Sequence, residues 1–146
     1  MIDIVIAEKK WRTPGLAARL EEAAMLALKK HKKAKVSLTL LLADDGRLQE
    51  LNRDFRGKNK STNVLSFPAD DDAYLGDIAL AYGVTAREAK AAKKTIADHA
   101  THLVVHGVLH LLGYDHETAR DAEIMEPLEV QILAKLGISD PYRVRA

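Results

Sequence analysis

The first half of the chain alternates apolar and other residues in several short segments, a period of two that is typical of β-strands. The alternation is regular over residues 2–6, where isoleucine occupies every second position, and over residues 36–42. Residues 63–67, which Pro68 ends, and residues 77–81, which follow an acidic turn, are similar short apolar segments. The sequence therefore predicts four short strands.

Two helices are expected between these strands. Thr13 and Pro14 have the residue types of a helix cap and a first helical position, and apolar residues at helical spacing follow to about His31. An Asp-Asp-Gly sequence at residues 44–46 ends the second strand and opens a shorter helix through Phe55. Each of these helices is amphipathic, so each is expected to cover part of a sheet.

The second half of the chain has the spacing of helices. Residues 85–88, Thr-Ala-Arg-Glu, have the form of a capping box, and a helical pattern runs from there to Leu112 with an interruption near residues 94–95. A last helix is expected from about Thr118 to Leu136, and we expect the short tail from Ser139 to be loosely ordered.

Four short strands followed by paired helices predict an α+β fold. We expect a small, mostly four-stranded mixed sheet packed with helices, with the histidine-rich helix on the sheet. The 146 residues contain no repeat and no long linker, so residues 1–146 are expected to form a single domain.

Composition narrows the class of protein further. Hydrophobic residues make up 47% and charged residues 29%, and there is no cysteine, which excludes a disulfide framework and a thiolate zinc site. The first residues lack the pattern of a signal peptide, and no apolar stretch approaches the length of a membrane span. We expect a cytoplasmic protein with no membrane partner.

Three histidines stand at positions i, i+4 and i+10: His106, His110 and His116. On a helix, His106 and His110 project from one face within reach of one metal ion. Gly113 is placed to end the helix in the left-handed conformation, which lets the chain turn back and bring His116 to the same ion. Three protein ligands predict an open catalytic zinc site, with one zinc ion and one position left for water.

This spacing is also the zinc frame of one class of metalloproteases, but Gly107 stands where those proteases carry a glutamate base. Glycine inside a helix indicates that something approaches the backbone closely, or that no side chain fits. Three neutral histidines leave the metal charge uncompensated and favour anionic substrates, phosphodiesters above all. His99 and His102 are interpreted as supporting or surface residues, and His31 as solvated.

Further motifs accompany the histidine frame, and together they resemble the YbeY family of bacterial metal-dependent endoribonucleases. The motifs are Leu51-Asn52, Phe55-Arg56-Gly57-Lys58, Thr62-Asn63-Val64-Leu65-Ser66-Phe67-Pro68, Leu75-Gly76-Asp77-Ile78 and the segment from His106 to His116. In order and spacing they cover most of residues 51–116. Two departures, Asn59 where relatives often have aspartate and Ser61 where they often have proline, affect the substrate loop and not the metal site.

The resemblance implies that His106, His110 and His116 are zinc ligands and that Arg56 acts in catalysis, with His106 as the other catalytic residue. It also implies a single-strand-specific, zinc-dependent endoribonuclease of ribosomal RNA maturation, acting at the 3′ end of the small-subunit RNA, and of ribosome quality control. The expected partners are single-stranded RNA, including ribosomal RNA, and the ribosome or its small subunit, with no DNA. Arginine fits phosphate oxygens bidentately, which lysine cannot do, and this supports the role of Arg56. Arg56, Lys58 and Lys60 are together predicted to bind the substrate, as a basic cluster that contacts the phosphate backbone.

Three other functions stay open at this point. A zinc peptidase has the right histidine spacing, another metal-dependent hydrolase fits the site equally well, and a ribosome-assembly binding module would make the zinc structural. The role of Asp115 is open between orienting a histidine and capping the final helix.

Overall fold

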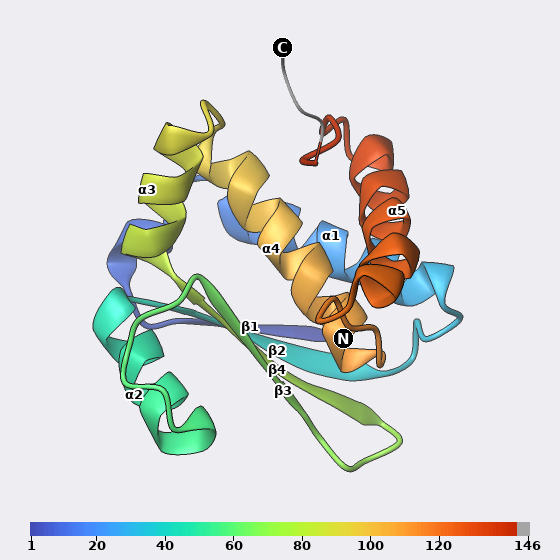
Figure 1. Ribbon diagram of the computed structural model, residues 1–146, viewed down its shortest axis with the longest axis horizontal. Helices are drawn as coiled ribbons and strands as arrows, with labels where there is room; N and C mark the ends of the chain where they lie inside the picture. Colours follow the sequence, from blue (N-terminus) through green and yellow to red (C-terminus); the bar gives the residue numbers. More distant parts are fainter. Residues whose placement is uncertain (143–146) are drawn as a thin grey trace.

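The computed structural model describes residues 1–142 and places a layer of helices over a four-stranded mixed sheet (Figure 1). The strands are β1 (Ile2–Ile6), β2 (Ser37–Ala43), β3 (Val64–Pro68) and β4 (Tyr74–Ala81). Their order is β1-β2-β4-β3; β1, β2 and β4 run parallel, and β3 pairs antiparallel with β4. The predicted α+β class and mixed sheet are confirmed, and β3 forms one edge of the sheet.

Six helical segments complete the described part of the chain. They are the short 3-10 helix η1 (Lys9–Trp11), α1 (Leu16–Lys30), α2 (Asp45–Arg56), α3 (Tyr82–Ala91), α4 (Ile96–Leu111) and α5 (Ala119–Lys135). The interruption expected near residues 94–95 separates α3 from α4, and Thr95 caps α4 by accepting a hydrogen bond from the Asp98 amide. Within residues 1–142, no helix combines the length and the apolar character needed to cross a membrane.

The predicted start of the first helix at Thr13 is wrong. The Leu16 amide donates to the Thr13 carbonyl at 3.1 Å, and Gly15 has a φ of 81°. Proline followed by a left-handed glycine is the signature of a tight turn as well as of a helix start. Here the turn forms, and α1 begins only after it, at Leu16.

The predicted capping box at residues 85–88 is also wrong, because α3 begins at Tyr82. Thr85 is buried, and its hydroxyl donates to the Ala81 carbonyl at 2.6 Å. Asp45 from α2 instead accepts a hydrogen bond from the Val84 amide at 2.9 Å, so it caps the first turn of α3 from another element. Strand β4 likewise starts earlier than expected, at Tyr74.

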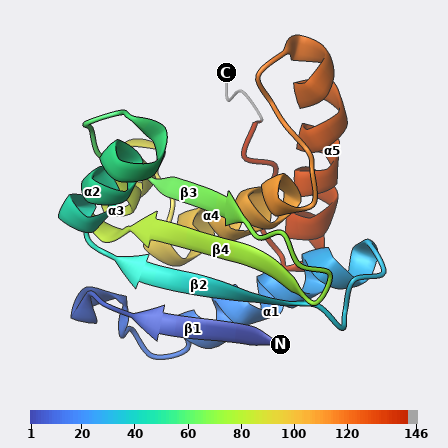
Figure 2. The ribbon, with the colours of Figure 1, turned by 90° about the horizontal axis from the view of Figure 1, so that it is seen from below.

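The sheet has an apolar core on each face. The larger core packs α1, α4 and α5 against one face, and Figure 2 shows α1 and α4 behind the strands. Leucines at alternate positions of β2 (Leu38, Leu40 and Leu42) are fully buried in it. The smaller core lies under α2 on the opposite face, where Leu48 and Leu51 pack with residues of β3 and β4. Because successive side chains of a strand point to opposite faces of the sheet, α1, α4 and α5 pack on one face and α2 packs on the other.

Helix α4 lies unusually close to the sheet at Gly107. A Cβ atom added there would lie 2.9 Å from Cγ2 of Ile78 and 3.2 Å from Oγ of Ser66. The Ser66 hydroxyl donates to the Gly107 carbonyl at 3.3 Å, which ties the helix to β3. The expectation that something approaches the backbone closely at Gly107 is confirmed, and the histidine helix lies on the sheet as predicted.

Candidate metal centre and substrate cavity

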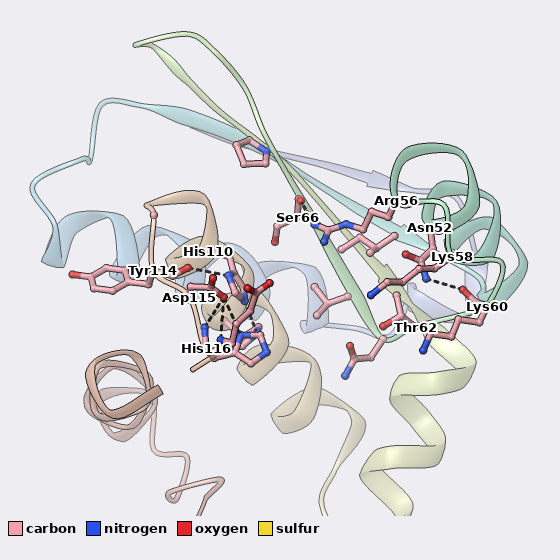
Figure 3. Close-up of a pocket in the computed structure, with 17 residues that line it drawn as sticks. Asn52, Arg56, Lys58, Lys60, Thr62, Ser66, His110, Tyr114, Asp115 and His116 are labelled. Atoms are coloured by element: carbon pink, nitrogen blue, oxygen red, sulfur yellow. Dashed lines mark hydrogen bonds and ion pairs between the residues drawn. The ribbon is translucent and has the colours of Figure 1, made fainter. Parts of the chain in front are cut away.

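The structure brings His106, His110 and His116 together, and Figure 3 shows His110 and His116 side by side. The first two lie one turn apart on α4, and His116 comes from the loop between α4 and α5. The centroids of the three rings are 4.5, 4.8 and 4.9 Å apart, and one ring nitrogen from each lies within 4.8 Å of the others. Gly113, with a φ of 104°, turns the chain back as the sequence predicted. These histidines form a group that could hold a metal ion.

Hydrogen bonds orient the two helical imidazoles. Nδ1 of His106 donates to Oε1 of Glu129 at 2.8 Å, and Nδ1 of His110 donates to the Tyr114 carbonyl at 3.0 Å. With those protons on Nδ1, both Nε2 atoms carry lone pairs, and they lie only 2.9 Å apart. Two lone pairs at that distance repel unless a proton or a cation lies between them, so the donor set fits a metal ion.

Burial also favours the neutral, metal-binding form of the His110 imidazole. Burial, followed by the neighbouring His106 and His116, lowers the pKa of the His110 imidazole below its ordinary value. A lowered pKa favours the neutral ring, which is the form that binds metals.

Glu129 is a fully buried carboxylate from α5 that the sequence analysis did not identify. Besides His106, it accepts hydrogen bonds from Nε2 of His102 at 2.6 Å and from the hydroxyl of Tyr142. Burial acts to raise the pKa of Glu129, but these donors outweigh it and hold the pKa at about 2. Burial and the Glu129 carboxylate raise the pKa of Tyr142. A negative charge therefore lies directly behind His106.

One signal in the sequence could have revealed Glu129. It lies between Met125 and Ile132 in the apolar stripe of α5, where a charged residue needs a buried partner. Its contact with Tyr142 also shows that residues 139–142 are tied to the site, contrary to the expectation for this tail; residues 143–146 lie outside the described part.

The remaining histidines have distinct places. His102 supports the site through Glu129, whereas Nε2 of His99 donates to Glu88 at 2.9 Å. The interpretation of His31 as merely solvated is wrong. Its Nδ1 donates to the Ala27 carbonyl at 2.9 Å, and its Nε2 lies 3.1 Å from the hydroxyl of Tyr114, because the end of α1 packs beside the loop that carries His116.

Asp115 stabilises that loop. Its carboxylate accepts hydrogen bonds from the amides of His116 at 2.7 Å and Glu117 at 3.3 Å. The cap of α5 is Thr118, so the capping role considered for Asp115 is wrong. The Asp115 carboxylate lies 4.0 Å from Nδ1 of His116, too long for a direct hydrogen bond.

A cavity of about 630 Å³ joins the histidines to the basic loop after α2. Arg56, Lys58 and Lys60 line it opposite the histidines (Figure 3). Nη2 of Arg56 donates to the Ser66 carbonyl on β3 at 3.0 Å, which fixes the guanidinium over the sheet edge. Asn52 is buried, and its amide donates to the Lys60 carbonyl at 3.0 Å, so it anchors the loop. Sequence reasoning assigned no such role to Asn52.

The three cations of this cavity carry uncompensated charge. Within residues 1–142, Arg56, Lys58 and Lys60 form no ion pair with an acidic side chain, unlike the neighbouring Arg53, which pairs with Asp54. Unpaired cations beside a histidine group suit a substrate with several negative charges.

Fold and site together define an α+β protein with a three-histidine centre that opens into a basic cavity. A family model described as Endoribonuclease YbeY matches residues 4–137, and the chain belongs to that family. Membership supports an endoribonuclease, a hydrolase with RNA as its substrate.

Individual relatives agree with the family match. An Endoribonuclease YbeY of Ruegeria sp. strain TM1040 is 44% identical, covering 97% of this chain and 96% of the relative. One of Chelativorans sp. strain BNC1 is 46% identical, covering 97% and 92%. The solution structure of a Thermotoga maritima protein matches with a TM-score of 0.64 at 27% identity, covering 99% of this chain and all of that one (100%).

Proposed function

We propose that the protein is a zinc-dependent endoribonuclease that cuts single-stranded RNA during ribosomal RNA maturation. The observation that carries the proposal is the joint lining of one cavity by the three histidines and by Arg56, Lys58 and Lys60. His106, His110 and His116 would hold one zinc ion, because three neutral imidazoles are a typical ligand set of catalytic zinc. Bound zinc supplies Lewis-acid chemistry, which polarises a phosphoryl oxygen and acidifies water.

Arg56 is the proposed catalytic cation. Its bond to the Ser66 carbonyl uses one of the five N–H donors of the guanidinium, and within residues 1–142 it is the one hydrogen bond of that group. The other donors can bind two oxygens of a phosphodiester and stabilise the negative charge that builds up in the transition state. Lys58 and Lys60 would hold the adjoining phosphates.

His106 is the second residue proposed to act in catalysis, as a metal ligand whose ring is held in place by Glu129. Glu129 accepts a hydrogen bond from Nδ1–H of His106, which leaves the Nε2 lone pair free to bind an ion and adds negative charge behind the ring. Gly107 argues against a peptidase, because the contact with Ile78 excludes the glutamate base that such an enzyme carries at this position.

The test is cleavage of end-labelled single-stranded RNA by protein of measured zinc content. Arg56→Ala is expected to lower kcat about 100-fold or more with zinc retained, whereas His110→Ala loses both activity and zinc. Arg53→Ala, on the same helix and paired only with its neighbour, is the matched control and should cut normally.

Two outcomes would overturn the proposal. Equal cutting by all variants would mean a contaminating nuclease, and RNA binding without cutting by zinc-loaded protein would favour a binding module. The 3′ ends of the products identify the nucleophile, since a 2′,3′-cyclic phosphate indicates attack by the neighbouring 2′-hydroxyl.

The proposal extends to the cellular substrate. We propose a cytoplasmic enzyme that acts on the 3′ end of small-subunit ribosomal RNA and in ribosome quality control, with the ribosome or its small subunit as partner. Small subunits carrying unprocessed RNA should be trimmed by the wild-type protein and not by Arg56→Ala. If the protein trimmed deproteinised RNA but not the RNA within small subunits, that result would contradict a ribosomal partner.

A further inference from the structure

Phe55 is an exposed aromatic residue next in sequence to Arg56, which lines the basic cavity. It lies in the last turn of α2 with 69% of its surface exposed, immediately before Arg56. Its ring meets that of Phe67 on the edge strand β3 edge to face, with centroids 5.5 Å apart and planes at 62°. Phe67 itself packs against the core under α2. One ring is thus anchored in the protein and holds the other in a fixed place at the surface.

Single exposed apolar side chains are common and need no explanation on their own. The surroundings of Phe55 distinguish it from the exposed apolar residue Val5, which lies on β1 at the far edge of the sheet. Phe55 is followed by Arg56 and Lys58, two cations that form no ion pair within the described residues 1–142. Aromatic faces alternating with cations form the surfaces that bind single-stranded nucleic acids, in which bases stack and phosphates pair.

The path from this ring to the cavity is short along the chain. Ser66 lines the cavity, and Phe67, the next residue of β3, points to the opposite face of the sheet. Arg56 spans the edge between them by its bond to the Ser66 carbonyl. A nucleotide chain whose phosphate lies on Arg56 can therefore cross the edge of β3 and place an adjacent base beside Phe55.

We propose that Phe55, held by Phe67, is a stacking platform for one unpaired base next to the phosphate that Arg56 binds. This inference rests on the proposed function, and it names the feature of the substrate that the site selects. A base inside a duplex is covered by its neighbours on both faces, so only an unpaired or splayed base can stack on Phe55.

The test compares the KM and kcat of zinc-loaded variants on a single-stranded oligoribonucleotide. Phe55→Ala is expected to raise KM about 5-fold to 100-fold, with kcat within about twofold. Phe55→Leu keeps an apolar contact with Phe67 but has no aromatic face, so it should behave like Phe55→Ala. Phe55→Trp should keep the wild-type KM, and Val5→Ala is the matched control for an exposed apolar residue.

Abasic substitution locates the stacked base. Removing the base at one position should raise the KM of the wild-type protein as much as Phe55→Ala does. The same removal should not raise the KM of Phe55→Ala any further. A wild-type KM in Phe55→Ala, or full activity in Phe55→Leu, would overturn the platform. If the wild-type protein fails to cut RNA, the proposed function fails. The same comparisons made by fluorescence anisotropy on labelled oligonucleotides then still decide the platform.

Discussion

The buried side chain of Glu129 connects three residues around the histidine site. It accepts hydrogen bonds from His102, His106 and Tyr142, and its negative charge lies behind His106, one of the three clustered histidines. The i, i+4 spacing of the histidines could be predicted because it depends only on helix geometry. The carboxylate could not be placed, because it reaches His106 across the packing of two helices, 23 residues further along the chain.

Glu129→Gln is expected to weaken zinc binding about 10-fold to 100-fold, because the neutral amide does not balance the metal charge and its single oxygen cannot accept at both ends, as the carboxylate does from His106 and His102. The zinc dissociation constant is measured by competition with a chelator. Glu123→Gln, exposed on the same helix, should leave it unchanged. Identical affinities in the two variants would show that Glu129 serves packing alone.

Gly107 and Gly46 should respond to alanine with opposite signs. At Gly107 the new Cβ would meet Ile78 at 2.9 Å, so crowding should exceed the helix propensity gained and lower the free energy of unfolding by about 1 kcal/mol. At Gly46 of α2 the nearest atom is 3.6 Å away, so alanine should raise it by up to about 1 kcal/mol. Urea denaturation measures both, and stabilisation by Gly107→Ala would contradict the close approach of α4.

At the level of elements, the patterning of apolar residues predicted where strands and helices lie, and local signals misplaced two helix starts. Proline and glycine at residues 14–15 favour a turn as strongly as a helix. The start of α3 depends on Asp45, a residue 39 positions away from the amide that it caps. Such a contact exists only in the folded chain, so a search for capping residues next to the helix could not find it.

Asp45→Ala should lower the free energy of unfolding by about 1–2 kcal/mol, because the Val84 amide loses its acceptor. The substitution also removes the ion pair with Arg87, which is exposed and contributes little. Asp54→Ala, which breaks only an exposed pair with Arg53, should change stability by less than about 0.5 kcal/mol. Equal stabilities of the two variants would argue that α3 does not depend on α2.

For the whole molecule, the net charge does not show how the basic residues are distributed over the surface. With 22 basic and 21 acidic residues the formal charge is only +1, yet three cations that form no ion pair in the described part of the chain line one cavity. The sequence shows Arg56, Lys58 and Lys60 close together along the chain, but only the fold shows that they line the same cavity as the histidines. RNA is therefore expected to be attracted by one face and not by the protein as a whole.

The salt dependence of RNA binding should count these cations. Three phosphate contacts on a single strand predict a slope of about −2 in a plot of log affinity against log salt concentration. Lys58→Ala should reduce its magnitude by about 0.7, and Lys29→Ala, exposed at the end of α1, should leave it unchanged. Fluorescence anisotropy over a series of salt concentrations gives the slopes, and a slope unaffected by Lys58→Ala would remove that residue from the interface.

The contact between Gly107 and the sheet also limits how this lineage can change its chemistry. A single codon change could supply glutamate at this position, but the side chain would collide with Ile78 and Ser66 before it could act as a base. Those neighbours belong to β4 and β3, so they would have to shrink or shift first, and each such step alone would loosen the packing under the histidine helix. Although this enzyme and a protease share the histidine spacing, a change from one to the other by single point mutations would pass through variants of lower stability.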